Sequence, residues 1–396
     1  MPLGSIALRE FDFFFDEELH ALARAVRDFA RDRVAPRRAP EDDDEARREA
    51  RELLGLLGET GWLRHAVPAE FGGTAPALSL RALSLIREAL ACASPLADAV
   101  YALQALGAMP IVLSGNQAMQ RHWLPVVATG RAMAAFAMTE PEAGSDVGAI
   151  ATRARREGDS YVLDGWKWLI SNAGIADFYC VFASTDPGRG RKGISCFVAE
   201  AGTPGLRFVA PQVLSAPHPL GEIAFEDCRV PAAARLGGEG EGLKLGLRTL
   251  DRLRATVAAA ACGMAARALE EALAHARRRR QFGSALADFQ LVRERLAVMA
   301  TELAAARLLT YRAAALADGG AERVTTESAM AKAFATEAAQ RIVDGAVQVH
   351  GGRGVLADHP VDRLYRSVRA LRIYEGTTEI QHLVIARGLL EPPEKS

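Results

Sequence analysis

The sequence predicts a mostly α-helical protein with a central β domain. The first and last parts of the chain repeat apolar residues at helical spacing, whereas the middle part has short β-branched or aromatic runs separated by Gly, Pro and Asp. With 396 residues, the chain is long enough for two or three domains with sizeable cores. We expect an N-terminal helical domain over residues 1–134, a middle antiparallel β domain over 135–236 and a C-terminal helical bundle over 237–396.

The N-terminal part begins with a capped amphipathic helix. Asp16 precedes a segment in which apolar residues recur every three or four positions from Leu19 to Phe29. Similar patterns begin at Ser79 and Pro95, and the pair Gly115-Asn116 marks the start of another helix.

The middle part has the pattern of a small sheet. Residues 161–165 and 166–171 indicate a hairpin with Asp164-Gly165 at its turn. Further strands are expected in four short runs: residues 178–184, 193–200, 206–210 and 222–225.

The C-terminal part returns to helical spacing after a Gly-rich junction at residues 237–242. No long apolar strand leads into this junction, so it does not have the context of a nucleotide-binding fingerprint. Long Ala- and Arg-rich helices are predicted over residues 250–277, 288–316 and 325–350. A last helix is expected from Thr378, which has capping-box spacing with Gln381.

The composition argues against several classes of binding partner. The chain is 49% hydrophobic and 24% charged with a net charge of −1, which favours a soluble protein with no nucleic-acid or membrane partner. Five cysteines without metal-ligand spacing indicate reduced thiols in a cytoplasmic protein, and no histidine pair predicts a metal site. Arg9, Glu10 and Asp12 near the start argue against a secretory signal.

Glu375 is the candidate for catalysis. It lies in a predicted break between two helices, directly after Ile373 and Tyr374. A carboxylate among apolar neighbours has a raised pKa, which suits a general base, and the following helix N-terminus offers N–H groups to an anion. A solvated Glu in front of a helix has the same local sequence.

Three segments together are specific to one family. Residues 137–149 (AMTEPEAGSDVGA) and 348–355 (QVHGGRGV) resemble the two signatures of the acyl-CoA dehydrogenases, and 374–377 (YEGT) resembles the segment that carries their catalytic carboxylate. The resemblance implies FAD as cofactor and a four-helix bundle in the C-terminal domain. Some relatives carry the base at the position of Leu253, which has no acidic group, so Glu375 is left as the base.

The resemblance also implies roles for individual residues. Arg279, in the pattern Arg-x-x-Phe-Gly, would reach the FAD pyrophosphate of a neighbouring subunit, which implies a homodimer or homotetramer. The residues implied to bind FAD are Phe136, Met138, Thr139, Gly144, Ser145, Leu169, Ile170, Ser171, Arg279, Phe282, Gln290, Gln348, Gly351, Gly352, Thr377 and Glu379. Those implied to contact substrate are Ser145, Arg254, Tyr374 and Gly376.

The expected reaction is α,β-dehydrogenation of an acyl-CoA to the trans-2-enoyl-CoA, with an electron-transfer flavoprotein as acceptor. Three alternatives stay open from the sequence. The same scaffold serves oxidases and monooxygenases, the thioester can be carried by an acyl-carrier protein, and a flavin-containing binding protein would have little turnover.

One loop departs from the family pattern. Many relatives carry an Arg and small hydroxyl residues before the strand at 222–225, close to the substrate entrance, whereas this chain has Ala216-Pro217-His218-Pro219-Leu220-Gly221. Two prolines fix φ and remove two N–H donors, which predicts a stiffer, less polar entrance with His218 as its titratable group. We therefore expect a substrate other than a plain straight-chain acyl-CoA, the alternative being a neutral loop substitution.

Overall fold

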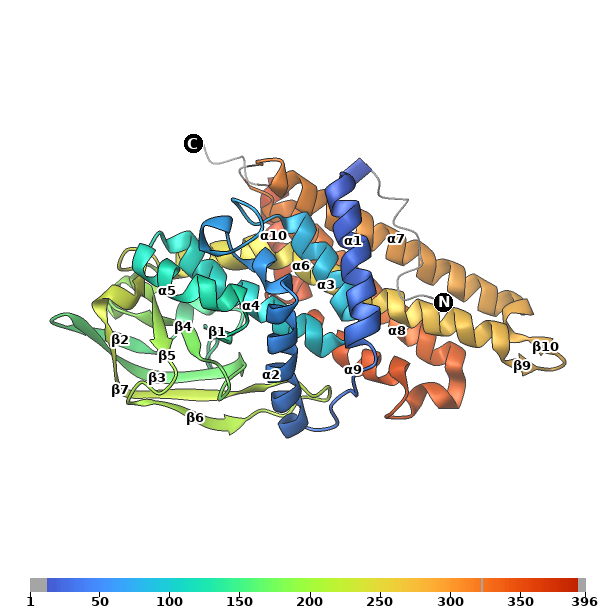
Figure 1. The fold of residues 1–396 in the computed structure, drawn as a ribbon, viewed down its shortest axis with the longest axis horizontal. Coiled ribbons are helices and arrows are strands. Elements are labelled where there is room, and N and C mark those ends of the chain that lie inside the picture. Colours follow the sequence, from blue (N-terminus) through green and yellow to red (C-terminus); the bar gives the residue numbers. More distant parts are fainter. Residues whose placement is uncertain (1–12, 322, 391–396) are drawn as a thin grey trace. The chain divides into compact units, whose positions relative to one another are not determined.

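The computed structural model describes residues 13–321 and 323–390, which form two compact units. Of the described residues, the helical unit comprises 13–39, 79–98, 251–321 and 323–390, and the sheet unit comprises 40–78 and 99–250 (Figure 1). Each unit therefore contains part of the N-terminal helices. The predicted division of the chain at residues 134 and 236 stays a prediction, and the N-terminal residues Arg9, Glu10 and Asp12 lie outside the described residues.

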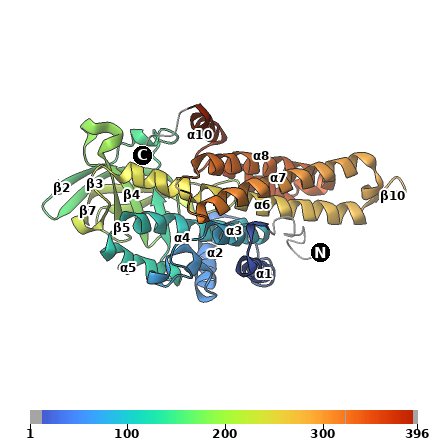
Figure 2. The same ribbon diagram turned by 90° about the horizontal axis from the view of Figure 1, so that it is seen from above.

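The helical unit is built on long helices that lie side by side (Figure 2). Its elements are α1 (Glu17–Phe29), a π-helical turn (Ala30–Val34), α3 (Leu80–Ala93), most of α6 (Gly242–Arg278), the short hairpin β9 (Arg280–Gln281) and β10 (Ser284–Ala285), α7 (Gln290–Asp318), α8 (Thr325–His350), α9 (Pro360–Leu371) and α10 (Thr378–Leu390).

Small residues bring the helices of this unit close together. The core between α6, α7, α8 and α9 is rich in alanine, including Ala261, Ala335 and Ala339. A Cβ atom on Gly263 of α6 would lie 2.1 Å from the carbonyl oxygen of Glu88 on α3, so only glycine permits this approach. The Ala-rich sequence of these helices therefore permits their close packing.

Asp318, at the end of α7, fixes the start of α3. Its carboxylate accepts hydrogen bonds from the Leu80 N–H at 2.6 Å and the Ser79 hydroxyl at 2.7 Å, and pairs with Arg81 at 3.0 Å. A carboxylate at a helix N-terminus satisfies unpaired N–H groups and is favoured by the helix dipole. This contact fixes the position of α3, which carries a residue of the site described below.

The sheet unit combines a twisted sheet with three longer helices. The helices are α2 (Asp43–Glu59), α4 (Pro95–Ser114, shared with the helical unit) and α5 (Gln117–Ala128), and the strands are β1 (Ala134–Ala137), β2 (Arg153–Glu157), β3 (Ser160–Ser171), β4 (Phe178–Ser184), β5 (Ile194–Glu200), β6 (Leu206–Pro211), β7 (Leu220–Pro231) and β8 (Arg235–Leu236). The strand order is β6-β7-β3-β2-β4-β5-β8, with β1 beside β4. The pairings are antiparallel except β1–β4 and β2–β4, which are parallel.

The sequence prediction of a turn at Asp164-Gly165 is wrong. Strand β3 is continuous through these residues, and its register against β7 shifts there as a β-bulge. Gly165 has φ 152°, and a Cβ atom there would lie 2.5 Å from the Thr152 hydroxyl oxygen, so glycine serves close approach within the sheet. The hairpin that does form joins β2 to β3, where Glu157 pairs with Ser160 across Gly158.

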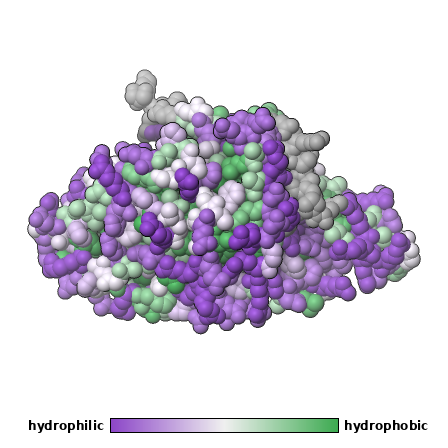
Figure 3. Space-filling model, viewed as in Figure 1, coloured by the Kyte–Doolittle hydropathy of each residue, from purple (hydrophilic) through white to green (hydrophobic). Residues whose placement is uncertain are grey.

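Helix α4 is long and apolar enough to cross a membrane by length and composition alone, but 72% of its apolar stretch is buried inside the protein. It is therefore a core helix. The face of the protein in Figure 3 is hydrophilic around α2, with apolar residues scattered among polar ones elsewhere. Single exposed apolar residues are normal on a soluble surface.

Candidate active site

Glu375 lies in the break between α9 and α10, and its backbone is unusual. Glu375 has φ 53° and Gly376 has φ 90°, so two consecutive residues adopt the left-handed conformation. This conformation costs a non-glycine residue free energy and persists only where surrounding contacts enforce it. The predicted break is confirmed, and its conformation places it among the strained positions common at functional sites.

Two buried side chains enforce this conformation. Lys332 of α8 donates from Nζ to the Gly376 carbonyl at 2.6 Å, and Gln381 of α10 donates from Nε2 to the same oxygen at 2.9 Å. Both side chains belong to fully buried residues. The Gln381 amide also donates to the Glu375 carbonyl at 3.3 Å. Gln381 therefore binds the carbonyls of both Glu375 and Gly376, and Lys332 binds that of Gly376, so two helices hold the backbone that follows Glu375.

The start of α10 differs from the predicted capping box. The Ile380 N–H donates to the Thr377 hydroxyl at 3.4 Å, so Thr377 is the capping residue, one position earlier than predicted. The Thr378 hydroxyl instead donates to Glu337 at 2.7 Å, which also pairs with Arg372 at 2.8 Å. Gln381 is not the reciprocal partner of a cap, because its amide is used on the Gly376 carbonyl.

Burial raises the pKa of the Glu375 carboxyl above its ordinary value, and the nearby cations Arg87, Lys332 and Arg254 oppose that rise. One carboxylate oxygen, Oε2, is buried without a hydrogen-bond partner among the described residues. Burial also lowers the pKa of Lys332 to about 8. An ionised carboxylate beside cations, with one free oxygen, can accept a proton from a bound molecule.

A buried ion pair on α3 and α4 adjoins this carboxylate. Arg87 donates from Nε and Nη2 to the two carboxylate oxygens of Asp98 at 2.8 and 2.9 Å, and from Nη1 to the Thr256 hydroxyl at 2.9 Å. Arg87 also hydrogen-bonds to Tyr374, the neighbour of Glu375. The sequence analysis missed this pair, although a charged residue amid the apolar run of residues 80–93 is a signal for it.

The alternative base position is apolar and buried. Leu253 on α6 is 3% exposed. The adjacent Arg254 donates from Nη1 to Asp251 at 2.8 Å, while its Nε is buried without a partner in the described part of the chain. Arg254 therefore keeps one buried N–H without a partner among the described residues, and its contact with substrate stays a prediction.

In the sheet unit, a buried ion pair anchors the loop that bears Thr139 and Ser145. Lys167 of β3 donates from Nζ to the Glu140 carboxylate at 2.8 Å and to the Met138 carbonyl at 3.0 Å. Ser145 and Gly144 are exposed and Thr139 is half-buried, whereas the Met138 side chain is in the core. Met138 can therefore offer a ligand its backbone but not its side chain.

Ser171, the last residue of β3, lies between two strained positions. Leu169 has φ 54° and Asn172 has φ 64°. The Leu169 N–H donates to the Gln212 side chain at 2.8 Å, and the Asn172 amide donates to the Ala134 carbonyl at 2.9 Å. Leu169 is 42% exposed, so an apolar side chain is held outward two residues before Ser171.

The other residues of the sheet unit that were predicted to bind FAD are less exposed to solvent. Ile170 is buried, and Phe136 is half-buried against Phe182 with a ring separation of 4.9 Å. The Trp168 indole, one position from the residue that the family pattern makes aromatic, donates to Glu222 at 3.1 Å. Its ring is therefore tethered to the neighbouring strand β7.

At one end of the helical unit, the other predicted cofactor residues gather on the surface. Phe282 and Gly283 have φ 51° and 82°, which forms a tight turn between β9 and β10 and leaves the Phe282 side chain 95% exposed. The ring of His275 on α6 lies 4.4 Å from that of His350 on α8, so the ends of these helices meet. The residues exposed around this end are Arg279, Gln290, Gln348, Gly351 and Gly352.

These residues fit FAD in kind. Hydroxyls on one exposed residue, Ser145, and two half-buried ones, Thr139 and Ser171, suit a polar planar ring, as does the exposed Leu169. An exposed guanidinium suits a diphosphate. Gly351 and Gly352 have open space where a Cβ would stand, which leaves the backbone accessible to a ligand. Within the described residues, no group of three His, Cys, Asp or Glu is arranged to hold a metal ion.

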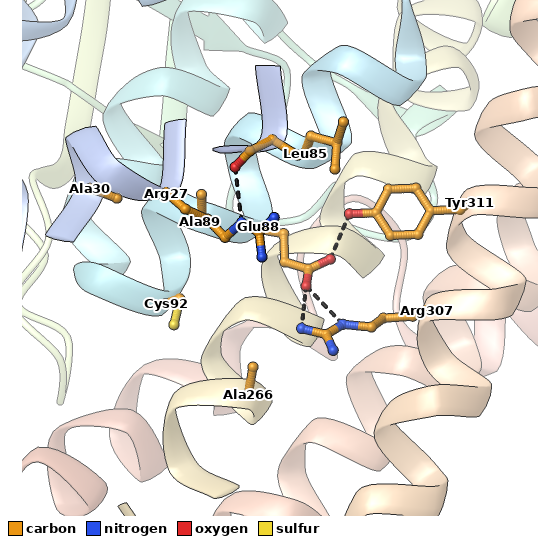
Figure 4. Close-up of a pocket in the computed structure, with 10 residues that line it drawn as sticks. Arg27, Ala30, Leu85, Glu88, Ala89, Cys92, Ala266, Arg307 and Tyr311 are labelled. Carbon is orange, nitrogen blue, oxygen red and sulfur yellow. Dashed lines mark hydrogen bonds and ion pairs between the residues drawn. The ribbon is translucent and has the colours of Figure 1, made fainter. Parts of the chain in front are cut away.

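A separate small cavity lies beneath α1 (Figure 4). It has about 30 Å³ of water-accessible space, too little for a cofactor or substrate. Glu88 on its wall accepts hydrogen bonds from Arg307 at 2.8 Å and from the Tyr311 hydroxyl at 2.6 Å. This buried cluster joins α3 to α7, and we assign it a structural role.

Models of three domains of one family match consecutive parts of the chain. The acyl-CoA dehydrogenase N-terminal domain matches residues 16–131, the middle domain matches residues 135–228, and the C-terminal domain matches residues 240–390. Together these matches cover most of the chain.

Curated relatives agree over nearly the full length. A probable acyl-CoA dehydrogenase of Mycobacterium tuberculosis is 38% identical, with 96% of this chain and 97% of the relative covered. Cyclohexane-1-carbonyl-CoA dehydrogenase of Geobacter metallireducens is 37% identical, with coverage of 96% and 99%.

Solved structures show the same fold. Butyryl-CoA dehydrogenase from Megasphaera elsdenii superposes with a TM-score of 0.89 at 33% identity and covers 95% of this chain and 99% of that one. A glutaryl-CoA dehydrogenase from Mycobacterium smegmatis, solved in complex with FADH2, has a TM-score of 0.88 at 27% identity, with coverage of 100% and 99%.

The Lys332 contact generates a prediction about pH. Lys332→Met removes both the hydrogen bond to the Gly376 carbonyl and a cation that lowers the pKa of Glu375. The Glu375 pKa should therefore rise, so the loss of activity should be larger at pH 6 than at pH 8. The pH profile of kcat/KM is the measurement, with the exposed Lys244→Met as control. An acid limb at an unchanged pH in Lys332→Met would rule out this electrostatic role.

Proposed function

This chain belongs to the acyl-CoA dehydrogenase family of FAD-dependent oxidoreductases, and we propose that it dehydrogenates an acyl-CoA thioester between C2 and C3. The product is the trans-2-enoyl-CoA. The observation that carries the proposal is the Glu375 carboxylate, held in a strained break beside cations with one oxygen free of partners.

In this proposal Glu375 removes the α-proton of the substrate. The carboxylate begins ionised, and its raised pKa strengthens it as a base compared with an exposed glutamate. Proton transfer produces a neutral carboxylic acid, which burial favours. Leu253, at the position that some relatives use for the base, has no group to share this role.

The thioester carbonyl needs hydrogen-bond donors where negative charge develops. In the family one of these donors is the backbone N–H of the catalytic glutamate, which corresponds to Glu375 in this chain. Gln381 binds the Glu375 carbonyl, and Lys332 and Gln381 bind the Gly376 carbonyl, so the backbone that follows this N–H would be fixed before substrate binds. Preorganised donors need no reorganisation during the reaction.

FAD, when bound, supplies the acceptor for the hydride that leaves C3. We propose that Thr139, Ser145 and Ser171 hold it from the sheet unit. Arg279, with the glutamines and glycines at the exposed end of the helical unit, would hold the diphosphate and adenine of a cofactor in a neighbouring subunit. An electron-transfer flavoprotein is the proposed electron acceptor.

The proposal includes an oligomer. Phe282 has a left-handed backbone in a tight turn, and this turn presents a large apolar side chain to solvent. This side chain is 95% exposed, and Leu291, in the first turn of α7, is 81% exposed. Such residues beside an exposed Arg279 fit a surface that is covered by a second copy of the chain. We propose a homodimer or homotetramer in which each copy completes the cofactor site of another.

For the acyl group, we propose a branched, cyclic or aromatic chain. The segment between β6 and β7 is tied down: the Asn172 N–H donates to the Pro219 carbonyl at 2.9 Å, and the Gln212 N–H donates to the Leu220 carbonyl at 3.0 Å. This supports the expected stiff entrance. The relative from Geobacter metallireducens, named for a cyclic acyl-CoA, supports the same class of substrate.

The first prediction from this function concerns Glu375→Gln. The variant should bind FAD and fold normally but lose the reductive half-reaction, because an amide cannot accept the α-proton. The rate of flavin bleaching by acyl-CoA should fall about 10²–10⁴-fold. Anaerobic stopped-flow absorbance measures it, with FAD content and circular dichroism as controls. Bleaching at nearly the wild-type rate would remove Glu375 from its role.

A second prediction concerns Arg279→Ala. Loss of the guanidinium should weaken FAD retention about tenfold or more and weaken subunit association as well, because one side chain serves both. Flavin content after gel filtration and sedimentation velocity are the measurements. The neighbouring exposed Arg278→Ala is the matched control. Full FAD content in an unchanged oligomer would mean that Arg279 is only a solvated residue.

A third prediction concerns the acyl group. In a panel of straight, branched, cyclic and aromatic acyl-CoAs under air, a non-straight chain should give the highest kcat/KM with an electron-transfer flavoprotein. Hydrogen peroxide is recorded in the same assay, and its stoichiometric release would favour an oxidase instead. If butyryl- or octanoyl-CoA is the best substrate by a wide margin, the substrate proposal is wrong.

A further inference from the structure

We propose that His218 is a positioning residue for the Ser171 hydroxyl and fixes the direction in which this hydroxyl hydrogen-bonds to FAD. The two side chains are in contact, with 2.8 Å between His218 Nε2 and Ser171 Oγ. The inference rests on the proposed function, in which Ser171 lies against the flavin ring.

The pairing of β3 with β7 and the two prolines beside His218 restrict the backbone on both sides of this contact. Ser171 is the last residue of β3 and pairs with Leu220, the first residue of β7. His218 lies two residues before Leu220, between Pro217 and Pro219, whose rings fix φ on both sides. The contact is therefore built into the point where β3 ends and β7 begins.

Arg47 of α2 clamps the two chains that carry the pair. It donates from Nη1 to the Ala173 carbonyl at 2.6 Å and from Nη2 to the Leu220 carbonyl at 2.8 Å. These carbonyls belong to residues two positions after Ser171 and two positions after His218. Asp43 pairs with the Arg47 Nε, which holds the guanidinium in this orientation.

The imidazole is neutral at physiological pH. Burial lowers the pKa of His218 to about 4, with a smaller contribution from the charge of Arg47. A neutral imidazole has one N–H and one free nitrogen, so Nε2 either donates to Ser171 Oγ or accepts its hydrogen. The expectation that His218 is the titratable group of the entrance is thereby replaced by a neutral imidazole paired with Ser171.

This pairing gives the hydroxyl two defined states. When His218 donates, the Ser171 hydrogen is free to bond to an acceptor on the ligand. When His218 accepts, the Ser171 oxygen is left to receive a hydrogen from the ligand. In the proposed function Ser171 would lie near flavin N5, a nitrogen that can accept a hydrogen bond when oxidised and carries a hydrogen when reduced. One serine would then serve both redox states through its histidine.

The test is a double-mutant cycle with His218→Phe and Ser171→Ala. The measurements are the visible spectrum of bound FAD, its reduction potential and the Kd of FAD for the apoprotein. His218→Phe should shift the spectrum and potential and weaken FAD binding about 2–10-fold, the net effect of a hydrogen bond. In the Ser171→Ala background, His218→Phe should have no additional effect. His218→Gln, which keeps a donor and an acceptor, should restore most of the wild-type values.

The outcomes separate the two claims. If Ser171→Ala changes the flavin properties and His218→Phe does not, the inference about His218 is overturned while the proposed function stands. If neither variant changes them, Ser171 is not at the flavin and its proposed placement fails. If His218→Phe changes only the KM for acyl-CoA and no flavin property, His218 contacts the substrate, not the flavin site, and the inference is overturned. His122→Phe, at an exposed position on α5, is the control, and circular dichroism reports folding.

Discussion

The Gly376 carbonyl is the anchor on which the catalytic geometry depends. Two buried donors, Lys332 from α8 and Gln381 from α10, bind this one oxygen and hold Glu375 in a left-handed conformation that its own side chain disfavours. A carboxylate on a freely rotating loop would turn toward water and lose its raised pKa. The packing of α8 and α10 is thus part of the chemistry, because it determines where the base points.

Charged side chains surround this base, and the positive charge of Arg87 is paired with the negative charge of Asp98. Arg87 and Asp98 form a buried pair beside Tyr374 and Glu375, and α3, which carries Arg87, is fixed at its start by Asp318. Burying an ion pair is costly unless its hydrogen bonds are satisfied, and here Thr256 takes a further donor of Arg87. The unit therefore places fixed charges of both signs close to Glu375.

Much of the fold could be predicted from sequence, because periodicity reflects local burial. The helix at 325–350 agrees with the structure, and the predicted strands lie within the observed ones except at Gly193, one residue before β5. The Asp164-Gly165 turn was wrong, since an Asp-Gly pair that suits a hairpin also suits a bulge and only the partner strand distinguishes them. The cap at Thr377 was missed because Glu337, distant in sequence, engages the Thr378 hydroxyl.

The candidate base followed from a short motif, but its supporting residues did not. Lys332, Arg87 and Asp98 come from helices far apart in sequence and meet Glu375 only in the folded chain. Their signal was a charge within an apolar helical stripe, which by itself does not reveal its partner. The His218–Ser171 pair is similar, because the loop was recognised as unusual while its contact depended on strand register.

The central claim, that Glu375 exchanges a proton with the α-carbon of a thioester, is tested most directly by isotope exchange. A thioester with α-hydrogens and no removable β-hydrogen, such as phenylacetyl-CoA, is incubated in D₂O with the wild-type protein or Glu375→Gln. Mass spectrometry then follows deuterium at the α-carbon. The account predicts exchange with the wild type and none above the solvent rate with the variant. Equal exchange by both proteins would contradict it.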